Sequence, residues 1–218
     1  LADWPDTFSA TLDWAGMASG LPVAVLDRLD DLRHNTAGET GRVVLEVSAL
    51  TEGRSQQYRP HRVIGHWVAH LAGHLAVGPM TTRILSHAGE ITLAALPLAE
   101  ATRHWQALLE GWQCGMQAPL PLSAKAGFAW LRAQGRAPDD AARAWQAAHD
   151  ALAPAGGGGE WAHNPYLRRA YPTARDLLGP PDLAHEASPF RHWTEQLLRP
   201  LWQAIPVSRR STPKEGQA

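Results

Sequence analysis

Acidic side chains fall on two neighbouring segments with strand-like composition. Asp27, Asp30 and Asp31 lie in the first segment, and Glu46 lies in the second. A magnesium-dependent nuclease needs an acid on one strand and an acid-x-lysine pair on the next. The carboxylates then hold Mg²⁺, and the lysine orients or activates the attacking water. Asp27 and Glu46 stand in that order, but Ser48 occupies the position where the lysine would stand.

The missing lysine decides how these acids are interpreted. The nearest downstream lysine, Lys125, is separated from Glu46 by two predicted helices and a hairpin. A solitary glutamate on a strand is more often a solvent-facing residue than a metal ligand. We therefore expect no catalytic activity here. An active Mg²⁺-dependent nuclease that uses Asp27 and Glu46 is kept as the alternative.

Histidines form the second candidate cluster. His66, His70 and His74 are four residues apart, so they share one side of a helix and could share a metal ion. A zinc hydrolase would place a glutamate directly after the first histidine, as in HExxH, whereas this chain has HWVAH. We interpret the histidines as a polar helix flank and keep a histidine-rich metal-binding domain as a further alternative.

Other catalytic motifs are missing from the sequence. Cys114 is the only cysteine, which excludes an internal disulfide, and its place near the inward stripe of a helix favours an inert buried thiol. There is no G-x-S-x-G elbow. The glycines at 156–159 are not followed by Lys-Ser/Thr, so they predict a flexible loop and no ATP-binding P-loop.

Composition limits the class of protein. The chain has 20 basic and 21 acidic side chains and a net charge of -1, so bulk DNA binding is not predicted from charge. Hydrophobic residues make up 44%, enough for a globular core. No apolar run reaches the length of about 18 residues that a membrane span needs. The chain begins at Leu1 without a signal-like segment, so we expect part of a longer protein.

The strands that would carry the acids are predicted from alternation and β-branched residues. Segments 21–33 and 41–50, joined by a polar turn, predict a hairpin. Segments 81–87 and 90–96 predict a second hairpin. The first 20 residues give only a weak indication of secondary structure. Taken together, the segments predict helices on one flank of a mainly antiparallel sheet.

Helical spacing of apolar residues predicts five helices, at residues 61–76, 98–116, 123–134, 138–153 and 187–202. Ser123 and Ser188 are predicted N-caps, Pro138 and Pro189 are predicted first-turn residues, and Pro200 should kink or end the last helix. The residues expected to face inward are Val63, Trp67, Leu71, Leu75, Leu98, Ala101, Trp105, Leu108, Trp112, Met116, Trp145, Phe190, Trp193, Leu197 and Leu201.

A series of motifs in residues 85–131 resembles one known family. The motifs are Pro97-Leu98, then Glu110-Gly111 through Gly115-Met116, then Pro119-Leu120, and then Gly127 with Ala129-Trp130-Leu131. Their order resembles the C-terminal domain of RecC, the gamma subunit of exodeoxyribonuclease V. The upstream Trp67, His70 and Leu71, the segment GGGGEWAHNPYLRRAY and the segment Leu197–Leu201 are similar too, so the resemblance covers about residues 22–202.

The resemblance implies a fold and a domain division. The fold is α/β (α+β), with a restriction-endonuclease-like (PD-(D/E)xK-type) core, a mixed sheet flanked by helices and a C-terminal helical extension. The core would be catalytically degenerate at Asp27, Glu46 and Ser48. We expect an N-terminal segment of a truncated chain at 1–20, the nuclease-like domain at 21–206 and a disordered tail at 207–218.

The resemblance also implies a function. The chain would be a non-catalytic domain of a RecC-like subunit of an ATP-dependent, cytoplasmic exodeoxyribonuclease V. That complex splits DNA strands and recognises Chi during double-strand-break repair. Its partners would be RecB- and RecD-like subunits and DNA, with no membrane, and Mg²⁺ and ATP would belong to the partner subunits. Candidate interface residues are Trp161, Tyr166, Arg168 and Arg169.

Overall fold

The computed structural model describes residues 4–54, 56–181 and 188–205. Its main sheet has five strands in the order β1-β2-β3-β6-β7, in which β3 and β6 are parallel and the other neighbours are antiparallel. The strands are β1 (Asp6–Ala18), β2 (Leu21–His34), β3 (Thr40–Leu45), β6 (Met80–Leu85) and β7 (Glu90–Leu93). The mixed sheet and both predicted hairpins are thereby confirmed.

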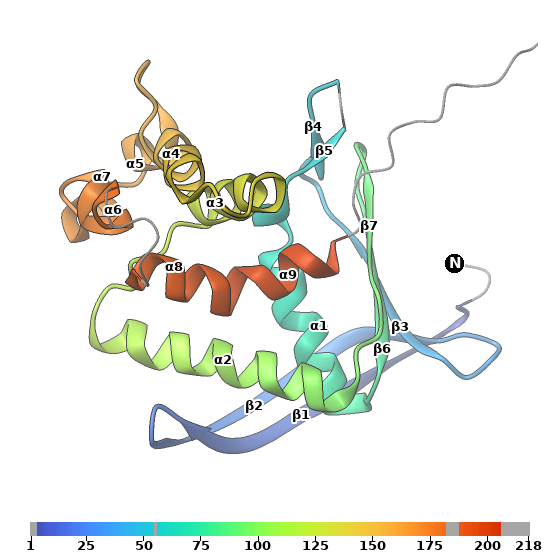
Figure 1. The fold of residues 1–218 in the computed structure, drawn as a ribbon. Helices are drawn as coiled ribbons and strands as arrows, with labels where there is room; N and C mark the ends of the chain where they lie inside the picture. Colours follow the sequence, from blue (N-terminus) through green and yellow to red (C-terminus); the bar gives the residue numbers. More distant parts are fainter. Residues whose placement is uncertain (1–3, 55, 182–187, 206–218) are drawn as a thin grey trace, which may run out of the picture.

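The helices lie on one side of this sheet, as predicted (Figure 1). The sheet bends, so that β1 and β2 run beneath α2 while β6 and β7 stand beside α1 (Figure 1). The helical elements are η1 (Pro60–Arg62), α1 (Ile64–Val77), α2 (Leu98–Gln117), α3 (Ala124–Arg136), α4 (Ala141–Leu152), α5 (Gly159–His163), α6 (Pro165–Ala170), α7 (Ala174–Leu178), α8 (Pro189–Trp193), the π-helical turn η3 (Thr194–Leu198) and α9 (Arg199–Ala204). The core between helices and sheet is apolar and includes Leu12, Leu32, Leu71, Ile84 and Leu131.

The first strand, β1, was not predicted. It pairs with β2 over most of its length, from Asp6 opposite His34 to Ala18 opposite Leu21. The turn between them contains Ser19 and Gly20, both with positive φ, which suits the twist of a two-residue hairpin loop. The segment expected to be a separate N-terminal piece therefore contributes an edge strand, Asp6–Ala18, to the same sheet as β2 and β3.

Two further local predictions were wrong. The polar segment 51–60 contains a short hairpin, β4 (Thr51–Glu52) with β5 (Gln57–Tyr58), where only a loop was expected. Helix α4 begins at Ala141 after the N-cap Asp140, whose side chain accepts a hydrogen bond from the Arg143 amide. The Asp140 carboxylate accepts from a backbone amide of the first turn, which the proline side chain of Pro138 cannot do. The helix therefore begins three residues later than predicted. The predicted tail at 207–218 lies outside the described residues.

The inward stripe of α2 consists of partly different residues than predicted. Ala101 and Trp105 are buried, but Leu98, Trp112 and Met116 are 49%, 56% and 71% exposed. The buried residues of this helix are Ala101, Trp105, Leu109, Gly111 and Gln113, so its inward stripe leaves out Trp112 and Met116. Helical spacing alone therefore overestimates how many apolar residues reach the core.

The last helix contains a shift of register. Phe190, Thr194, Leu198 and Leu201 are buried, while Trp193 and Leu197, predicted to face inward, are only half-buried. The π-helical turn at 194–198 holds more residues per turn than an α-helix, so the buried positions move one residue along the chain. Pro200 follows directly in α9 and cannot donate the backbone hydrogen bond of a regular helix.

Candidate functional site

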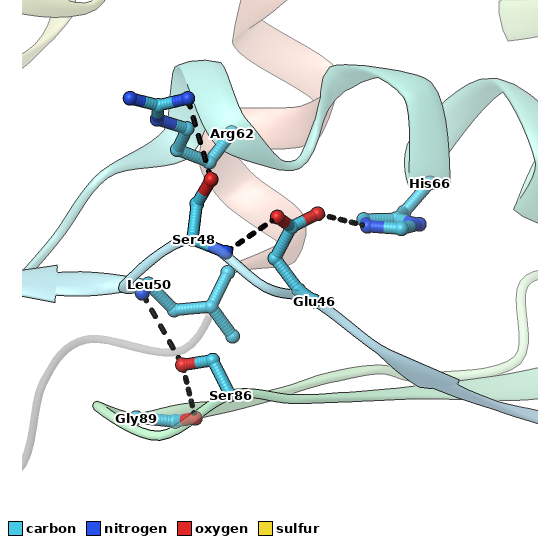
Figure 2. A network of polar contacts seen from close by, with 7 residues as sticks. All are labelled: Glu46, Ser48, Leu50, Arg62, His66, Ser86 and Gly89. Carbon is cyan, nitrogen blue, oxygen red and sulfur yellow. Dashed lines mark hydrogen bonds and ion pairs between the residues drawn. The ribbon is translucent and has the colours of Figure 1, made fainter.

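Glu46 lies immediately after β3, at the end where α1 begins. Its amide donates a hydrogen bond to the Leu85 carbonyl at 2.7 Å, so the chain still runs beside β6. One carboxylate oxygen accepts from the Ser48 amide at 2.9 Å, and the other lies 3.0 Å from His66 Nε2 (Figure 2). Both oxygens of this carboxylate, a metal ligand only in the alternative hypothesis, therefore have partners within the protein.

The segment after Glu46 is fixed by further polar contacts (Figure 2). Arg62 donates to the Ser48 hydroxyl at 3.5 Å, and the Leu50 amide donates to the Ser86 hydroxyl at 3.3 Å. Ser86 in turn donates to the Gly89 carbonyl at 3.1 Å. This network joins the end of β3 to η1 on one side and to the β6–β7 turn on the other.

The hydrogen bonds also favour the charged form of Glu46. The amide of Ser48 lowers the pKa of the Glu46 carboxyl most, and His66 lowers it further. Glu46 is thus an ionised acceptor that holds a loop in place.

Asp27 lies in a different part of the sheet. It pairs with Leu12 of β1, and its side chain accepts a hydrogen bond from the amide of Arg28. The β2–β3 ladder contains only three residue pairs and ends at Leu32 opposite Arg42. In the described part of the chain, no hydrogen bond or ion pair joins Asp27 to Glu46.

The other residues of the predicted nuclease site are also dispersed. The Asp30 carboxylate accepts hydrogen bonds from Ser9 and Arg28, which lower its pKa. Asp31 has a φ of 60°, a left-handed conformation at the point where β2 leaves β3. Lys125 lies on α3, and no ion pair links it to Glu46 among the described residues.

The comparison with protein families bears on this arrangement. A family model described as the RecC C-terminal domain matches residues 1–135, which run from β1 to the last turn of α3. The chain belongs to the RecC C-terminal domain family. Among curated proteins, no match was found. Family membership implies a RecC-like role in a multi-subunit RecBCD complex for DNA repair.

Two glycines of the RecC-like motifs lie where helices approach one another closely. A Cβ atom on Gly111 of α2 would lie 2.9 Å from a Leu197 methyl group, and one on Gly127 of α3 would lie 2.5 Å from a Leu198 methyl group. The RecC family match ends before both leucines. Because these two glycines carry no side chain, the C-terminal helix can pack closely against α2 and α3.

The histidines interpreted as a polar helix flank do not form one, because His70 and His74 are buried, so that interpretation was wrong for these two residues. His70 donates from Nε2 to the Ala94 carbonyl at 3.2 Å, so its Nδ1 accepts from Thr82 at 2.9 Å. His74 donates from Nδ1 to the His70 carbonyl and accepts the Leu96 amide at Nε2, 2.9 Å away. No group of three potential metal-ligating His, Cys, Asp or Glu side chains occurs in the described residues.

Burial keeps the two inner histidines neutral, although the hydrogen bonds that they donate to backbone carbonyls act in the opposite direction. Both side chains are fully buried. Burial lowers the pKa of His70 to about 3, with a smaller contribution from His74, and burial also lowers the pKa of His74. Each neutral ring supplies one donor and one acceptor, and the structure uses both.

Sequence reasoning did not predict the contact between His66 and Glu46. The chain runs from strand β3 through helix α1 to the parallel strand β6, and this order could have predicted the contact. In such a connection the first turn of the helix lies near the carboxyl end of the first strand. His66, in the first turn of α1, is thereby placed next to a residue just beyond β3. The same reasoning places Arg62 near Ser48.

The predicted interface residues lie on α5 and α6. Tyr166 is 84% exposed, and Arg168 and Arg169 are exposed beside it. Trp161 is half-buried against the core, and its Nε1 has no hydrogen-bond partner in the described chain. These four residues lie beyond the RecC family match.

Proposed function

We propose that this chain is a non-catalytic, restriction-endonuclease-like domain of a RecC-like subunit, which supports complex assembly and guides DNA strands. The observation that carries the absence of catalysis is the environment of Glu46. Its two oxygens are engaged by Ser48 and His66, and among the described residues no lysine forms an ion pair with it. The nuclease-like core is supported by the strand pair β2–β3 followed by α1 and the parallel strand β6.

In this proposal the partners supply the chemistry. RecB- and RecD-like subunits bind Mg²⁺ and ATP, and this domain contacts the RecD-like subunit in the cytoplasm. Exposed Tyr166, Arg168 and Arg169, with the half-buried Trp161, provide the aromatic and arginine side chains typical of interface cores. In the described chain, no helix has both the length and the apolar character to cross a bilayer.

A nuclease assay tests the catalytic part of the proposal. The purified chain is incubated with linear duplex and single-stranded DNA in Mg²⁺ or Mn²⁺, beside the variant Glu46→Ala. We expect no cleavage by either protein. Cleavage by the wild type that is lost in Glu46→Ala would establish the alternative, a nuclease that uses Asp27 and Glu46.

A binding assay tests the assembly part. A RecD-like subunit is used to capture the wild type and the double variant Arg168→Gln/Arg169→Gln. We expect capture of the wild type and weaker capture of the variant. A folded wild-type chain that is not captured, alone or with the RecB-like subunit, would contradict the docking role.

A further inference from the structure

A cationic cavity lies between the β4–β5 hairpin, η1 and α3, which are neighbours in Figure 1. It has a volume of about 250 Å³. Its polar lining consists of Glu52, Tyr58, Arg59, His61, Lys125 and Arg132, and its apolar lining consists of Pro60, Phe128, Ala129 and Ala151. None of these residues belongs to the network around Glu46.

Positive charge dominates the lining. Arg59 pairs with Glu52, with 3.3 Å between Nε and Oε2. Among the described residues, no carboxylate forms an ion pair with Lys125 or Arg132. The nearby Glu160 instead accepts hydrogen bonds from the Ser123 hydroxyl and the Lys125 backbone amide. Glu52, which lines the same cavity, favours the charged form of Arg132 from a distance, but among the described residues it balances only one of the three positive charges of Arg59, Lys125 and Arg132.

Three buried nitrogen atoms of the lining lack hydrogen-bond partners in the described chain, Arg59 Nε, His61 Nε2 and Arg132 Nε, of which only Arg59 Nε is in an ion pair, with Glu52. A buried donor without an acceptor is costly, and a bound acceptor would remove that cost. Burial lowers the pKa of His61, and the charges of Lys125, Arg62 and Arg59 lower it further. The positive charges around the cavity therefore disfavour protonation of the His61 ring.

Arg132 is held in place before any ligand binds. Its terminal nitrogen donates to the Tyr58 carbonyl at 3.4 Å, and its guanidinium lies 5.9 Å from the centre of the Trp202 ring. A guanidinium fixed by such contacts loses less freedom when it binds an oxyanion. Arg132 is thus suited to a fixed binding role at this cavity.

We propose that this cavity binds a phosphate group, supplied either by DNA or by free phosphate. Arginine and lysine side chains beside apolar walls are a favourable setting for an oxyanion, because low polarity strengthens the attraction. The cavity is smaller than the roughly 300–1,000 Å³ of pockets for drug-sized ligands, which favours one small oxyanion. The DNA source rests on the proposed DNA-guiding function, whereas phosphate binding itself does not.

The first experiment uses inorganic phosphate. Thermal unfolding of the full chain is measured in phosphate and in chloride at equal ionic strength. Phosphate also stabilises proteins non-specifically, so the informative quantity is the difference between variants. Lys125→Gln removes an exposed charge of the cavity, and Arg168→Gln removes an exposed charge on α6 as the matched control.

We expect phosphate to raise the unfolding temperature of the wild type and of Arg168→Gln more than that of Lys125→Gln. Loss of one charged hydrogen bond should weaken phosphate binding by about tenfold. Arg132→Gln should behave like Lys125→Gln if it folds. Equal rises in wild type, Lys125→Gln and Arg168→Gln would overturn the proposal, whatever the behaviour of Arg132→Gln.

The second experiment distinguishes the sources. Binding of labelled single-stranded DNA, with and without a 5′-phosphate, is measured by fluorescence anisotropy across salt concentrations. If DNA supplies the phosphate, Lys125→Gln should lower the salt slope of the affinity by about one. A phosphate response lost in Lys125→Gln, with unchanged DNA binding, supports the cavity with free phosphate as its ligand.

The phosphate-binding proposal and the proposed function can be contradicted independently of each other. Capture by the RecD-like subunit does not depend on Lys125, so intact capture with no phosphate response in the first experiment overturns the cavity alone.

Discussion

Glu46 illustrates how a single acidic residue at the end of a strand can have a structural role. Its carboxylate joins the loop after β3 to the first turn of α1 through Ser48 and His66. The same residue type at the same place in a nuclease would face a metal ion. The partners around the side chain therefore separate the two roles better than the residue type does.

Replacing Glu46 should reduce stability. Glu46→Ala leaves the Ser48 amide without its acceptor, so we expect the free energy of unfolding to fall by about 1–3 kcal/mol in urea denaturation. Glu90→Ala is the control, because Glu90 forms an exposed ion pair with Arg83 whose loss should cost at most about 1 kcal/mol. Equal losses in the two variants would contradict the structural role of Glu46.

His70 should make stability depend on pH. Its folded pKa of about 3 lies below the ordinary value of 6.5, so the unfolded chain binds the proton first. Stability is therefore fully present above pH 6.5 and falls as the pH drops toward 3. Between pH 6.5 and 5 we expect a loss of about 2 kcal/mol from this residue.

The measurement is urea denaturation in small pH steps, with His70→Gln as the comparison. The variant is expected to be less stable at pH 7 but to lose less between pH 6.5 and 5. Identical pH slopes in both proteins would show that His70 is not held neutral.

At the scale of elements, α3 contains a natural pair of test positions. A Cβ atom on Gly127 would lie 2.5 Å from a Leu198 methyl carbon, while Gly135 has no such atom within 4 Å. We expect Gly127→Ala to destabilise the protein by about 1–3 kcal/mol through overpacking. Gly135→Ala should stabilise it by up to about 1 kcal/mol through helix propensity.

Thermal unfolding of the two variants checks this prediction. Both substitutions add one methyl group to the same helix, so the difference in their unfolding temperatures isolates the contact with the C-terminal helix. A stabilising effect of Gly127→Ala would mean that Leu198 does not pack against α3 as described.

The elements differ in how well the sequence predicts them. The N-caps at Ser123 and Ser188 and the helix α1 are confirmed, because capping and helical spacing act over short distances. Strand β1 was missed because its inward positions include small residues of low strand propensity, such as Ala10 and Gly16. The Ser19–Gly20 pair was the available signal for this hairpin.

At the scale of the whole molecule, the candidate site shows what could not be predicted from the sequence. Predicting Asp27 beside Glu46 assumes that β2 and β3 stay paired along their length. The observed register, with Leu32 opposite Arg42, would bring Glu46 opposite Arg28 if it continued. The ladder stops first, and strand separation depends on tertiary packing that neither strand's sequence reveals.

The matched residues 1–135 should not form a stable unit alone. The buried core also includes Phe190, Leu198 and Leu201, which lie outside the RecC family match. Removing them exposes the packed faces of α2 and α3, and each lost large apolar side chain costs about 1.5–3 kcal/mol. We expect residues 1–135 to unfold without a cooperative transition, as measured by circular dichroism, whereas residues 1–205 unfold cooperatively.

The early end of the β2–β3 ladder has a consequence for solubility. In the described chain, no strand pairs with residues 21–31 of β2 on the side away from β1, so this stretch offers a template for a strand of another molecule. Asp27, Arg28 and Asp30 place exposed charges there, which discourages such pairing. Replacing Asp27 and Asp30 by asparagine should increase concentration-dependent aggregation in light scattering. Asp27, which the alternative hypothesis treated as a metal ligand, would then serve to prevent association of the molecules.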